Sequence, residues 1–286
     1  MALTANLRGS LFMTAAMAGF AVEDAFLKLA SQEIPVGQAI TMMGTLGVIV
    51  FGLFALGAGE APLPRSVLTR HMAIRSGFEI TGRLFYALAI ALTPLSVASA
   101  ILQAAPLVVV LGAALIFGEK VGWQRWALIL TGFVGVLIIL RPGLEGFSAL
   151  SLLALVAMAG FSGRDLATRA APPALSNAQL GVTGYIMLTL SGLIILSVTG
   201  GVRVPSGQVL VLLAAASLFG IAAYAALTKA MRMGSVAVVT PFRYTRLLFA
   251  MVIGAVVFGE RPDAATLAGS AVIVACGIAI LTRRSR

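Results

Sequence analysis

Long apolar stretches alternate with short polar connectors along this whole sequence. A helix that crosses a lipid bilayer needs about 20 mostly apolar residues. Ten stretches of about that length, bounded by glycine, proline or charged residues, lie at 9–30, 36–58, 72–92, 96–117, 122–141, 147–168, 177–199, 207–229, 235–258 and 264–282. The pattern therefore predicts an all-α integral membrane protein with ten transmembrane helices. The connectors leave no room for a soluble domain.

Composition agrees with a membrane protein. Hydrophobic residues make up 60% of the chain and charged residues 10%, whereas soluble domains carry about 25% charged residues. A folded chain of this size still exposes a large surface. The solvent around most of that surface must therefore be lipid.

The formal net charge of +10 would suggest nucleic-acid binding in a soluble protein. No basic stripe with interleaved aromatic residues lies outside the apolar stretches, so no nucleic-acid partner is expected. Lys and Arg gather instead in alternate connectors, as the positive-inside rule describes. The poorer side holds Arg141, Arg203 and Arg261, with Lys28 near it. We predict a bacterial inner-membrane protein with both termini in the cytoplasm.

The second half of the sequence repeats features of the first. Three motifs recur in the same order: MAGF at 17–20 and 158–161, SVA at 96–98 and 235–237, and FGEK or FGER at 117–120 and 258–261. Each half would hold five spans, and because five is odd the second half must cross the membrane in the opposite sense. Such an inverted repeat gives transporters two related states open to opposite sides. We expect the two halves at 1–142 and 147–286.

The ten spans, the two halves and the Gly-Glu-basic turns at 118–120 and 259–261 resemble the EamA family of the drug/metabolite transporter superfamily. The resemblance implies a bacterial exporter of amino acids and related metabolites that works without ATP or a cofactor. The family's aromatic amino-acid exporters are the closest in layout. The partners implied are the lipid bilayer and a small-molecule substrate.

The third span carries an unusual row of charges. His71, Arg75, Glu79 and Arg83 recur every four residues and share one helical face, which Tyr86 roughly continues. A charge at the bilayer centre costs at least ~2.5–3.5 kcal/mol on insertion scales. We expect Arg75 near the interface, where its side chain can reach water. For Glu79 and Arg83, together with Tyr86, we predict a place in a substrate-binding wall, with ion pairing between helices as the alternative.

The ninth span places Arg243, Tyr244 and Arg246 about 10–15 Å into a helix that starts near residue 235. The repeat sets Gln103 of the fourth span against Tyr244, and the eighth span adds Tyr224. Arginine is suited to a bidentate grip on a carboxylate. Since the intramembrane acids look too few for all these bases, we predict that Arg243 and Arg246 bind a substrate carboxylate, with Gln103, Tyr224 and Tyr244 beside them.

The first and sixth spans carry matching charged residues, namely Glu23, Asp24 and Lys28, and Arg164, Asp165 and Arg169. Lys28 and Arg169 can pair back to Asp24 and Asp165 at i,i+4 spacing. We predict that these six residues form gates or ion pairs that differ between the access states. Static pairs at the interface are the alternative.

Prolines and glycines suggest where helices bend and touch. Pro106 and Pro241 remove helical hydrogen bonds and can kink or hinge the fourth and ninth spans. The fifth and tenth spans carry little charge and several small residues, including Gly132, Gly135, Gly269 and Gly277. Small-residue faces let helices approach closely, so these spans should pack on neighbours or form a dimer contact. The protein is a monomer or, alternatively, a homodimer.

Catalytic and metal-binding patterns are missing from the sequence. It has one Cys and one His, no phosphate-binding loop and no metal-ligand spacing, so we expect neither an enzyme nor a metal site. No filter-like loop or ring of like charge suggests a channel. The sequence favours a secondary transporter that exports amino acids, aromatic or otherwise amphipathic, by alternating access. An uptake carrier, or a permease for drug- or nucleoside-type metabolites, is the alternative.

Overall fold

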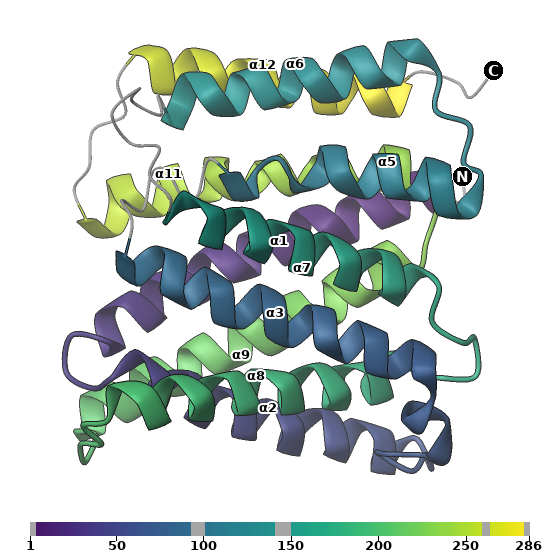
Figure 1. Cartoon of the computed structure of the whole chain (residues 1–286). Helices are drawn as coiled ribbons and strands as arrows, with labels where there is room; N and C mark the ends of the chain where they lie inside the picture. Colours follow the sequence, from purple (N-terminus) through teal and green to yellow (C-terminus); the bar gives the residue numbers. More distant parts are fainter. Residues whose placement is uncertain (1–3, 93–100, 141–149, 259–263, 283–286) are drawn as a thin grey trace.

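The computed structural model describes residues 4–92, 101–140, 150–258 and 264–282. Within these ranges every regular element is helical, and most of the helices run along one common direction of the molecule or against it (Figure 1). The α-helices are α1 (Ala5–Ala30), α2 (Val36–Gly57), α3 (Arg70–Leu92), α5 (Ala105–Phe117), α6 (Trp123–Leu140), α7 (Ser151–Arg169), α8 (Asn177–Thr199), α9 (Gly207–Met231), α10 (Val236–Val239), α11 (Thr245–Phe258) and α12 (Ala264–Thr282). Two 3₁₀ turns are described, η1 (Arg65–Leu68) and η3 (Thr240–Tyr244).

Five of the described helices are long and apolar enough to cross a membrane. They are α1, α2, α8, α9 and the stretch Val236–Val257, which joins α10, η3 and α11. Shorter apolar helices lie in α5, α6 and α12. The remaining long helices, α3 and α7, carry most of the buried charges described below. The chain is therefore a helical membrane protein, as the hydropathy pattern predicts.

The two prolines interrupt helices, and the predicted distortion is confirmed. Residues 103 and 104 form a turn before α5, which begins at Ala105 with Pro106 in its first turn. Pro241 lies in η3, between α10 and α11. A 3₁₀ turn has three residues per turn instead of 3.6, so side chains after Pro241 point in different directions from those of a continuous α-helix.

Helices of the first half pack against helices of the second. The main pairs are α1 with α9, α2 with α8, α3 with α7, and α6 with α12 (Figure 1). Gly135 of α6 illustrates the close approach, because a Cβ there would lie 3.0 Å from the Gly269 carbonyl oxygen of α12. The small residues of these two helices therefore serve packing within the chain.

The glycine of the repeated MAGF motif marks a helix crossing in each half. A Cβ on Gly19 would lie 2.9 Å from the Ala223 Cβ of α9, and a Cβ on Gly160 would lie 2.5 Å from the Gly82 amide nitrogen of α3. Gly160 follows Gly19 by 141 positions, and Ala223 follows Gly82 by the same number. The two crossings are thus counterparts under the sequence repeat.

Two glutamines obey the same relation. The Gln38 side-chain amide of α2 donates to the Arg203 carbonyl oxygen at 2.6 Å. The Gln179 amide of α8, 141 positions later, donates to the Ala61 carbonyl oxygen at 2.9 Å. Each glutamine therefore ties its helix to a connector of the opposite half.

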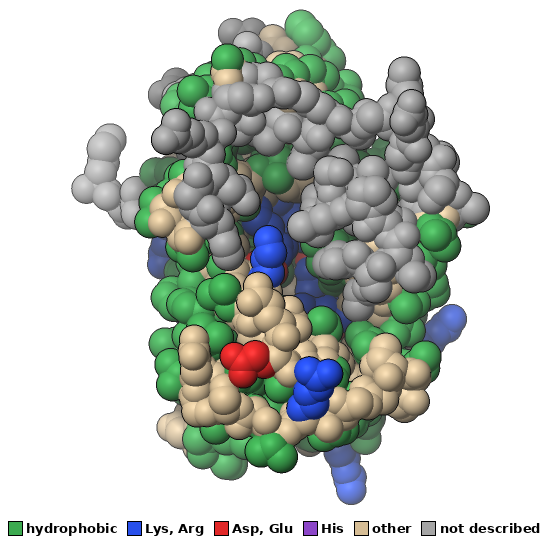
Figure 2. Space-filling view, turned by 90° about the vertical axis from the view of Figure 1, so that its left-hand side faces the viewer, with side chains coloured by type: hydrophobic (Ala, Val, Ile, Leu, Met, Phe, Trp, Pro, Cys, Tyr) green, Lys and Arg blue, Asp and Glu red, His purple; other side chains and the backbone are tan. Residues whose placement is uncertain are grey.

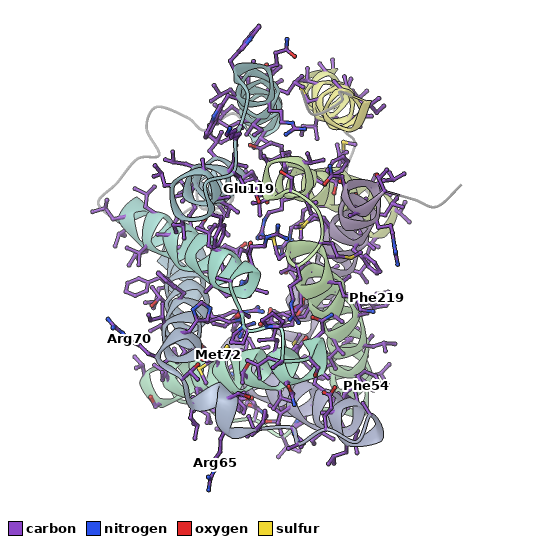
Figure 3. All side chains as sticks on the ribbon, turned by 90° about the vertical axis from the view of Figure 1, so that its right-hand side faces the viewer. Phe54, Arg65, Arg70, Met72, Glu119 and Phe219 are labelled. Carbon is purple, nitrogen blue, oxygen red and sulfur yellow. The ribbon has the colours of Figure 1, made fainter. Side chains whose placement is uncertain are left out.

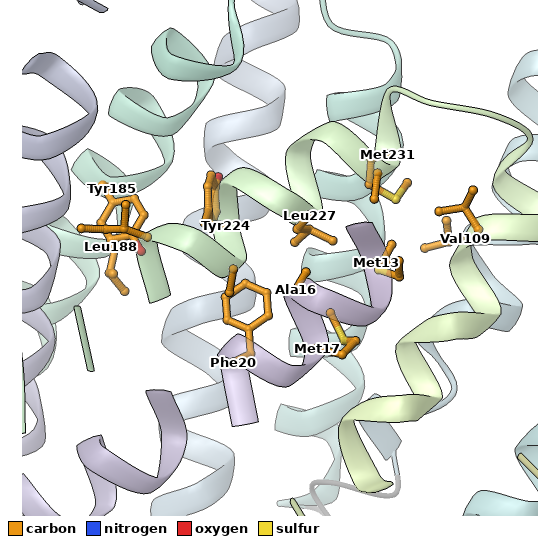
Figure 4. Close-up of a cluster of buried hydrophobic side chains, with 14 of the residues drawn as sticks. Met13, Ala16, Met17, Phe20, Val109, Tyr185, Leu188, Tyr224, Leu227 and Met231 are labelled. Atoms are coloured by element: carbon orange, nitrogen blue, oxygen red, sulfur yellow. The ribbon is translucent and has the colours of Figure 1, made fainter. Parts of the chain in front are cut away.

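The main apolar core lies along α1 and α9. Met13, Met17 and Phe20 of α1 face Leu227 and Met231 of α9 (Figure 4). This core also includes Val109, Tyr185 and Tyr224, which lie on α5, α8 and α9. Tyr185 and Tyr224 lie at the edge of this core, next to the charged side chains at the centre of the molecule.

Candidate functional site

A cluster of charged side chains lies buried among helices of both halves. We call it the central cluster. Its members come from α1, α3, α7, η3 and α11, and α9 adds a tyrosine. They are Glu23, Asp24, Arg75, Glu79, Arg83, Arg164, Asp165, Tyr224, Arg243 and Arg246.

Glu79 is the centre of this cluster and is fully buried. Its carboxylate accepts hydrogen bonds from Arg164 Nη1 at 3.0 Å and from the Tyr224 hydroxyl at 2.9 Å. Arg83 Nε lies 3.4 Å from the same carboxylate. The predicted neighbours Glu79, Arg83 and Tyr224 are therefore brought together. Both Glu79 oxygens already have partners, which favours the ion-pairing alternative for this residue.

Arg75 is also fully buried, so the expectation that its side chain reaches water is wrong. Its guanidinium donates to the Thr168 hydroxyl at 3.0 Å, the Thr183 hydroxyl at 3.3 Å and the Tyr224 hydroxyl at 2.8 Å. It therefore joins α3 to α7, α8 and α9. Neither threonine could be predicted as a partner of Arg75, because neither carries a charge or belongs to a motif.

The two arginines of the ninth span each have a carboxylate partner. Arg243 pairs with Asp165 and Arg246 with Asp24. The expectation that unpaired positive charge lies at these two arginines is therefore wrong. Asp24 and Asp165 are 141 positions apart, so two neighbouring arginines hold equivalent aspartates of the two halves.

The predicted i,i+4 pair of the sixth span is replaced by other contacts. Asp165 accepts from Arg164 Nε at 2.7 Å in addition to its bond with Arg243. Arg169 lies instead 3.7 Å from Glu119, the glutamate of the first Gly-Glu-basic turn. In the first span, Lys28 lies in the last turn of α1 and is exposed.

Three predicted site residues lie at the margin of the central cluster or outside it. Tyr244 packs in an apolar cluster with Val136 of α6 and Ile273 of α12. Gln103 is half-buried in the turn before α5. The Tyr86 ring meets the Phe161 ring edge-on, with centroids 5.9 Å apart. Tyr244 therefore faces α6 and α12, because the 3₁₀ turn at Pro241 changes the direction of its side chain.

Glu23 differs from the other acids of the central cluster. It is 7% exposed, and within the described residues it has neither a hydrogen bond nor an ion pair. Its carboxylate fills the space beside Gly220 of α9, where a Cβ would lie 2.6 Å from the Glu23 Oε1 atom. Sequence reasoning had treated Glu23 as one more pairing residue. Under the 141-residue repeat, Glu23 corresponds to Arg164, and Glu79, the partner of Arg164, corresponds to Gly220. The repeat therefore places a glycine where Glu23 would need a charged partner.

The two ends of the helix array differ. Where α1 turns into α2 and α8 into α9, the face of the molecule has a central hollow with basic side chains at its bottom (Figure 2). At the opposite end, where the termini lie, Glu119 accepts hydrogen bonds from the Ser235 hydroxyl at 2.8 Å and the Val236 amide at 3.3 Å (Figure 3). Glu119 thus ties the end of α5 to the start of α10.

Exposure within the central cluster is uneven. The Asp24 side chain is 51% exposed, Arg246 29% and Arg83 23%, whereas Glu79 is 0% exposed. The cluster therefore combines an exposed part, which includes the Asp24–Arg246 pair, with a closed part around Glu79. Within the described residues, no group of three or more His, Cys, Asp or Glu side chains is arranged to hold a metal ion.

Comparison with known proteins adds a family and several relatives. A model of the EamA-like transporter family matches the chain twice, at residues 7–141 and 148–283. The chain is 27% identical to a riboflavin transporter of Vibrio cholerae, over 97% of this chain and 93% of that protein. It is 26% identical to a pseudopaline exporter of Pseudomonas aeruginosa over 95% of each chain. It is also 26% identical to an S-adenosylmethionine uptake transporter of Rickettsia felis, over 68% of this chain and 65% of that protein.

A solved crystal structure has the same fold. It superposes with a TM-score of 0.80 at 21% sequence identity, covering 96% of this chain and 97% of the other. At this identity the likeness concerns the fold alone.

Proposed function

The chain belongs to the EamA-like transporter family of the drug/metabolite transporter superfamily, and on that premise we propose that it is a secondary carrier of amino acids and related amphipathic metabolites. The observation that carries the proposal is the central cluster, where charged side chains of both halves meet. Charges inside a membrane are costly unless they are paired or face water. A cluster with both paired and accessible members is suited to a binding site that water and a polar substrate can enter.

We infer further that ten helices cross the membrane as two inverted halves, 1–142 and 147–286. Three observations support this arrangement: the antiparallel pairing of first-half with second-half helices, the equivalent glycine crossings, and the double match of the family model. Inverted repeats allow alternating access around a site near the midplane. We also propose the bacterial inner membrane as its location, with cytoplasmic termini.

Arg83 is the group that we expect to bind a substrate carboxylate. Its side chain is 23% exposed, and within the described residues its guanidinium makes one long contact, of 3.4 Å between Nε and Glu79. Arg243 and Arg246 are held by Asp165 and Asp24 and would form the neighbouring wall. The central cluster contains five arginines and four carboxylates, so one positive charge is left over if all are ionised. That excess favours a substrate that carries a carboxylate.

Export is the direction that we propose first, and uptake is the alternative. The names of the relatives include both an exporter and an uptake transporter, so both directions are represented among proteins with similar sequences. A flux assay should therefore load substrate on either side of the membrane.

The test is flux into and out of vesicles that contain the purified protein. We expect saturable transport of labelled phenylalanine and counterflow, in which unlabelled substrate on the far side accelerates exchange. Arg83→Gln should reduce the preference for phenylalanine over phenylalaninamide by about 10- to 100-fold, because hydrogen bonds to charged groups contribute ~1.5–3 kcal/mol. Arg70→Gln is the matched control, since Arg70 lies on the same helix and is exposed at the periphery (Figure 3).

Three outcomes would contradict the proposal. Flux that never saturates would indicate a channel, and a chemically altered solute would indicate an enzyme. Saturable transport of other metabolites without any transport of amino acids would assign the carrier a different substrate class.

A further inference from the structure

We propose that Glu23 binds the ammonium group of the substrate and that Tyr185 belongs to the same subsite. The inference rests on the proposed function and extends it, because it assigns the second charged group of an amino acid to its own subsite. The starting point is the buried Glu23 carboxylate, which has no hydrogen bond or ion pair within the described part of the chain. Its oxygens are not among the fully enclosed side-chain atoms that lack a partner in the described part of the chain, so a cation from outside the protein can reach and neutralise this carboxylate.

The sequence repeat shows that this lack of a partner is specific to one half. Glu23 and Arg164 are equivalent positions, and so are Glu79 and Gly220. In the α3–α7 pair, Arg164 forms an ion pair with Glu79 at 3.0 Å. In the α1–α9 pair, Glu23 meets the bare backbone of Gly220. The same geometry therefore yields a closed ion pair in one half and an open carboxylate in the other.

Tyr185 of α8 supplies a second polar group with unused bonding capacity. It is 3% exposed, and its hydroxyl has no hydrogen bond within the described residues. The Tyr185 side chain packs in one cluster with Phe20 of α1, which lies three positions before Glu23 on the same helix. The Tyr185 ring stands edge-on to the Tyr224 ring, with centroids 5.4 Å apart, which fixes its position.

Of the other charged groups around Glu23, Asp24 and Arg246 already have partners, and Arg83 can still bind a substrate carboxylate. Asp24 on the same helix and Arg246 of α11 pair with each other. Arg83 of α3 has the long contact with Glu79 described above. α9 packs directly against Glu23 and brings the backbone of Gly220 to its carboxylate, and Tyr224, one turn further along α9, is bonded to Glu79 and Arg75. An amino acid placed here would set its ammonium group on Glu23 and its carboxylate on Arg83.

The test measures binding apart from transport. Thermal unfolding of the purified protein can be followed with a thiol-reactive dye, because Cys276 is its single cysteine and is buried. The probes are phenylalanine, phenethylamine, which lacks the carboxylate, and 3-phenylpropionate, which lacks the amine. Glu23→Gln should raise the half-maximal stabilising concentration of both amines by about tenfold, which corresponds to about 1.4 kcal/mol. The value for 3-phenylpropionate should stay unchanged.

A second variant acts on the same carboxylate from the opposite helix. Gly220→Ala would place a methyl group where the Glu23 oxygens lie, so it should weaken amine binding in the same way. This effect should vanish in the Glu23→Gln background if the two residues act together. Gly77→Ala is the matched control, because a Cβ at Gly77 meets nothing within 4 Å. Glu33→Gln is the control for the carboxylate, since Glu33 is exposed outside the helices.

The inference is overturned if Glu23→Gln leaves the half-maximal stabilising concentration of phenethylamine unchanged, or if it raises the value for 3-phenylpropionate equally. It is also overturned if neither phenylalanine nor phenethylamine stabilises the wild-type protein. It is also overturned if the variant only abolishes acceleration of flux by a pH gradient, which would make Glu23 a proton carrier. Vesicle flux judges the proposed function separately. A carrier that transports phenylalanine with Glu23→Gln as selectively as the wild type would keep the function and lose this subsite.

Discussion

Replacing Glu79 tests whether the closed part of the central cluster holds the helices together. Glu79→Gln keeps the size of the side chain but removes the charge that Arg164 and Arg83 face. Breaking a buried ion pair by removing one partner costs about 3–5 kcal/mol. Because the amide still accepts one hydrogen bond, we expect the lower end of this range, about 3 kcal/mol. For a chain of this size that corresponds to a fall of about 6–12 °C in the unfolding midpoint.

The assay is the same thiol-dye measurement at Cys276, in detergent, with Arg70→Gln as the control. The double variant Glu79→Gln with Arg164→Gln should recover part of the loss, because contacting residues couple by about 0.5–3 kcal/mol. A midpoint within about 1 °C of the wild type would refute the reasoning, since it is based on a buried pair of this cost. Strictly additive single and double variants would refute it as well. Transport lost at unchanged stability would instead place Glu79 in contact with the substrate.

Three further predictions concern topology, packing and the paired arginines. Reporter fusions after the C-terminus and in the 59–69 connector should report a cytoplasmic location. A fusion within 200–206 should report the opposite side of the membrane, and an external C-terminus would contradict the ten-span arrangement. Gly160→Val should destabilise the protein by at least about 1–3 kcal/mol in the thiol-dye assay, because overpacking forces backbone shifts, while Gly77→Val should change little; equal effects would argue against the crossing. Arg243→Ala should lower vesicle flux of phenylalanine and phenylalaninamide alike, because Asp165 already neutralises this arginine; a loss confined to phenylalanine would show that Arg243 binds the substrate carboxylate after all.

The helices and the contact between Glu79 and Arg83 could be predicted from the sequence because both depend on periodicity. A four-residue spacing places Glu79 and Arg83 on one face in any α-helix, and the structure joins them. The burial of the Arg75 side chain could not be predicted in this way. It was judged from its distance to the end of its own helix, whereas its burial depends on the neighbouring helices that supply Thr168 and Thr183.

Tyr244 shows a second limit. Its predicted direction assumed an unbroken α-helix from residue 235, and a 3₁₀ turn intervenes at Pro241. A proline signals that helical geometry changes, but the sequence does not say by what angle the later side chains rotate. The partners of Asp24 and Asp165 were missed for a related reason, because pairs within one helix can be counted along the chain and pairs between helices cannot.

The glycine crossings have a mechanical consequence. Gly19 divides α1 into arms of about 21 Å and 17 Å, taking 1.5 Å per residue, and at the point of contact it meets only the small Ala223 methyl group and the α9 backbone. Two rods that touch at one smooth point can tilt without unlocking interdigitated side chains, so a small tilt would widen one end of the pair while narrowing the other. Gly160 provides the same fulcrum for an antiparallel pair of helices. The molecule thus contains two helix crossings about which the paired helices can tilt. The charged residues lie close to both crossings, where such a tilt would displace them least.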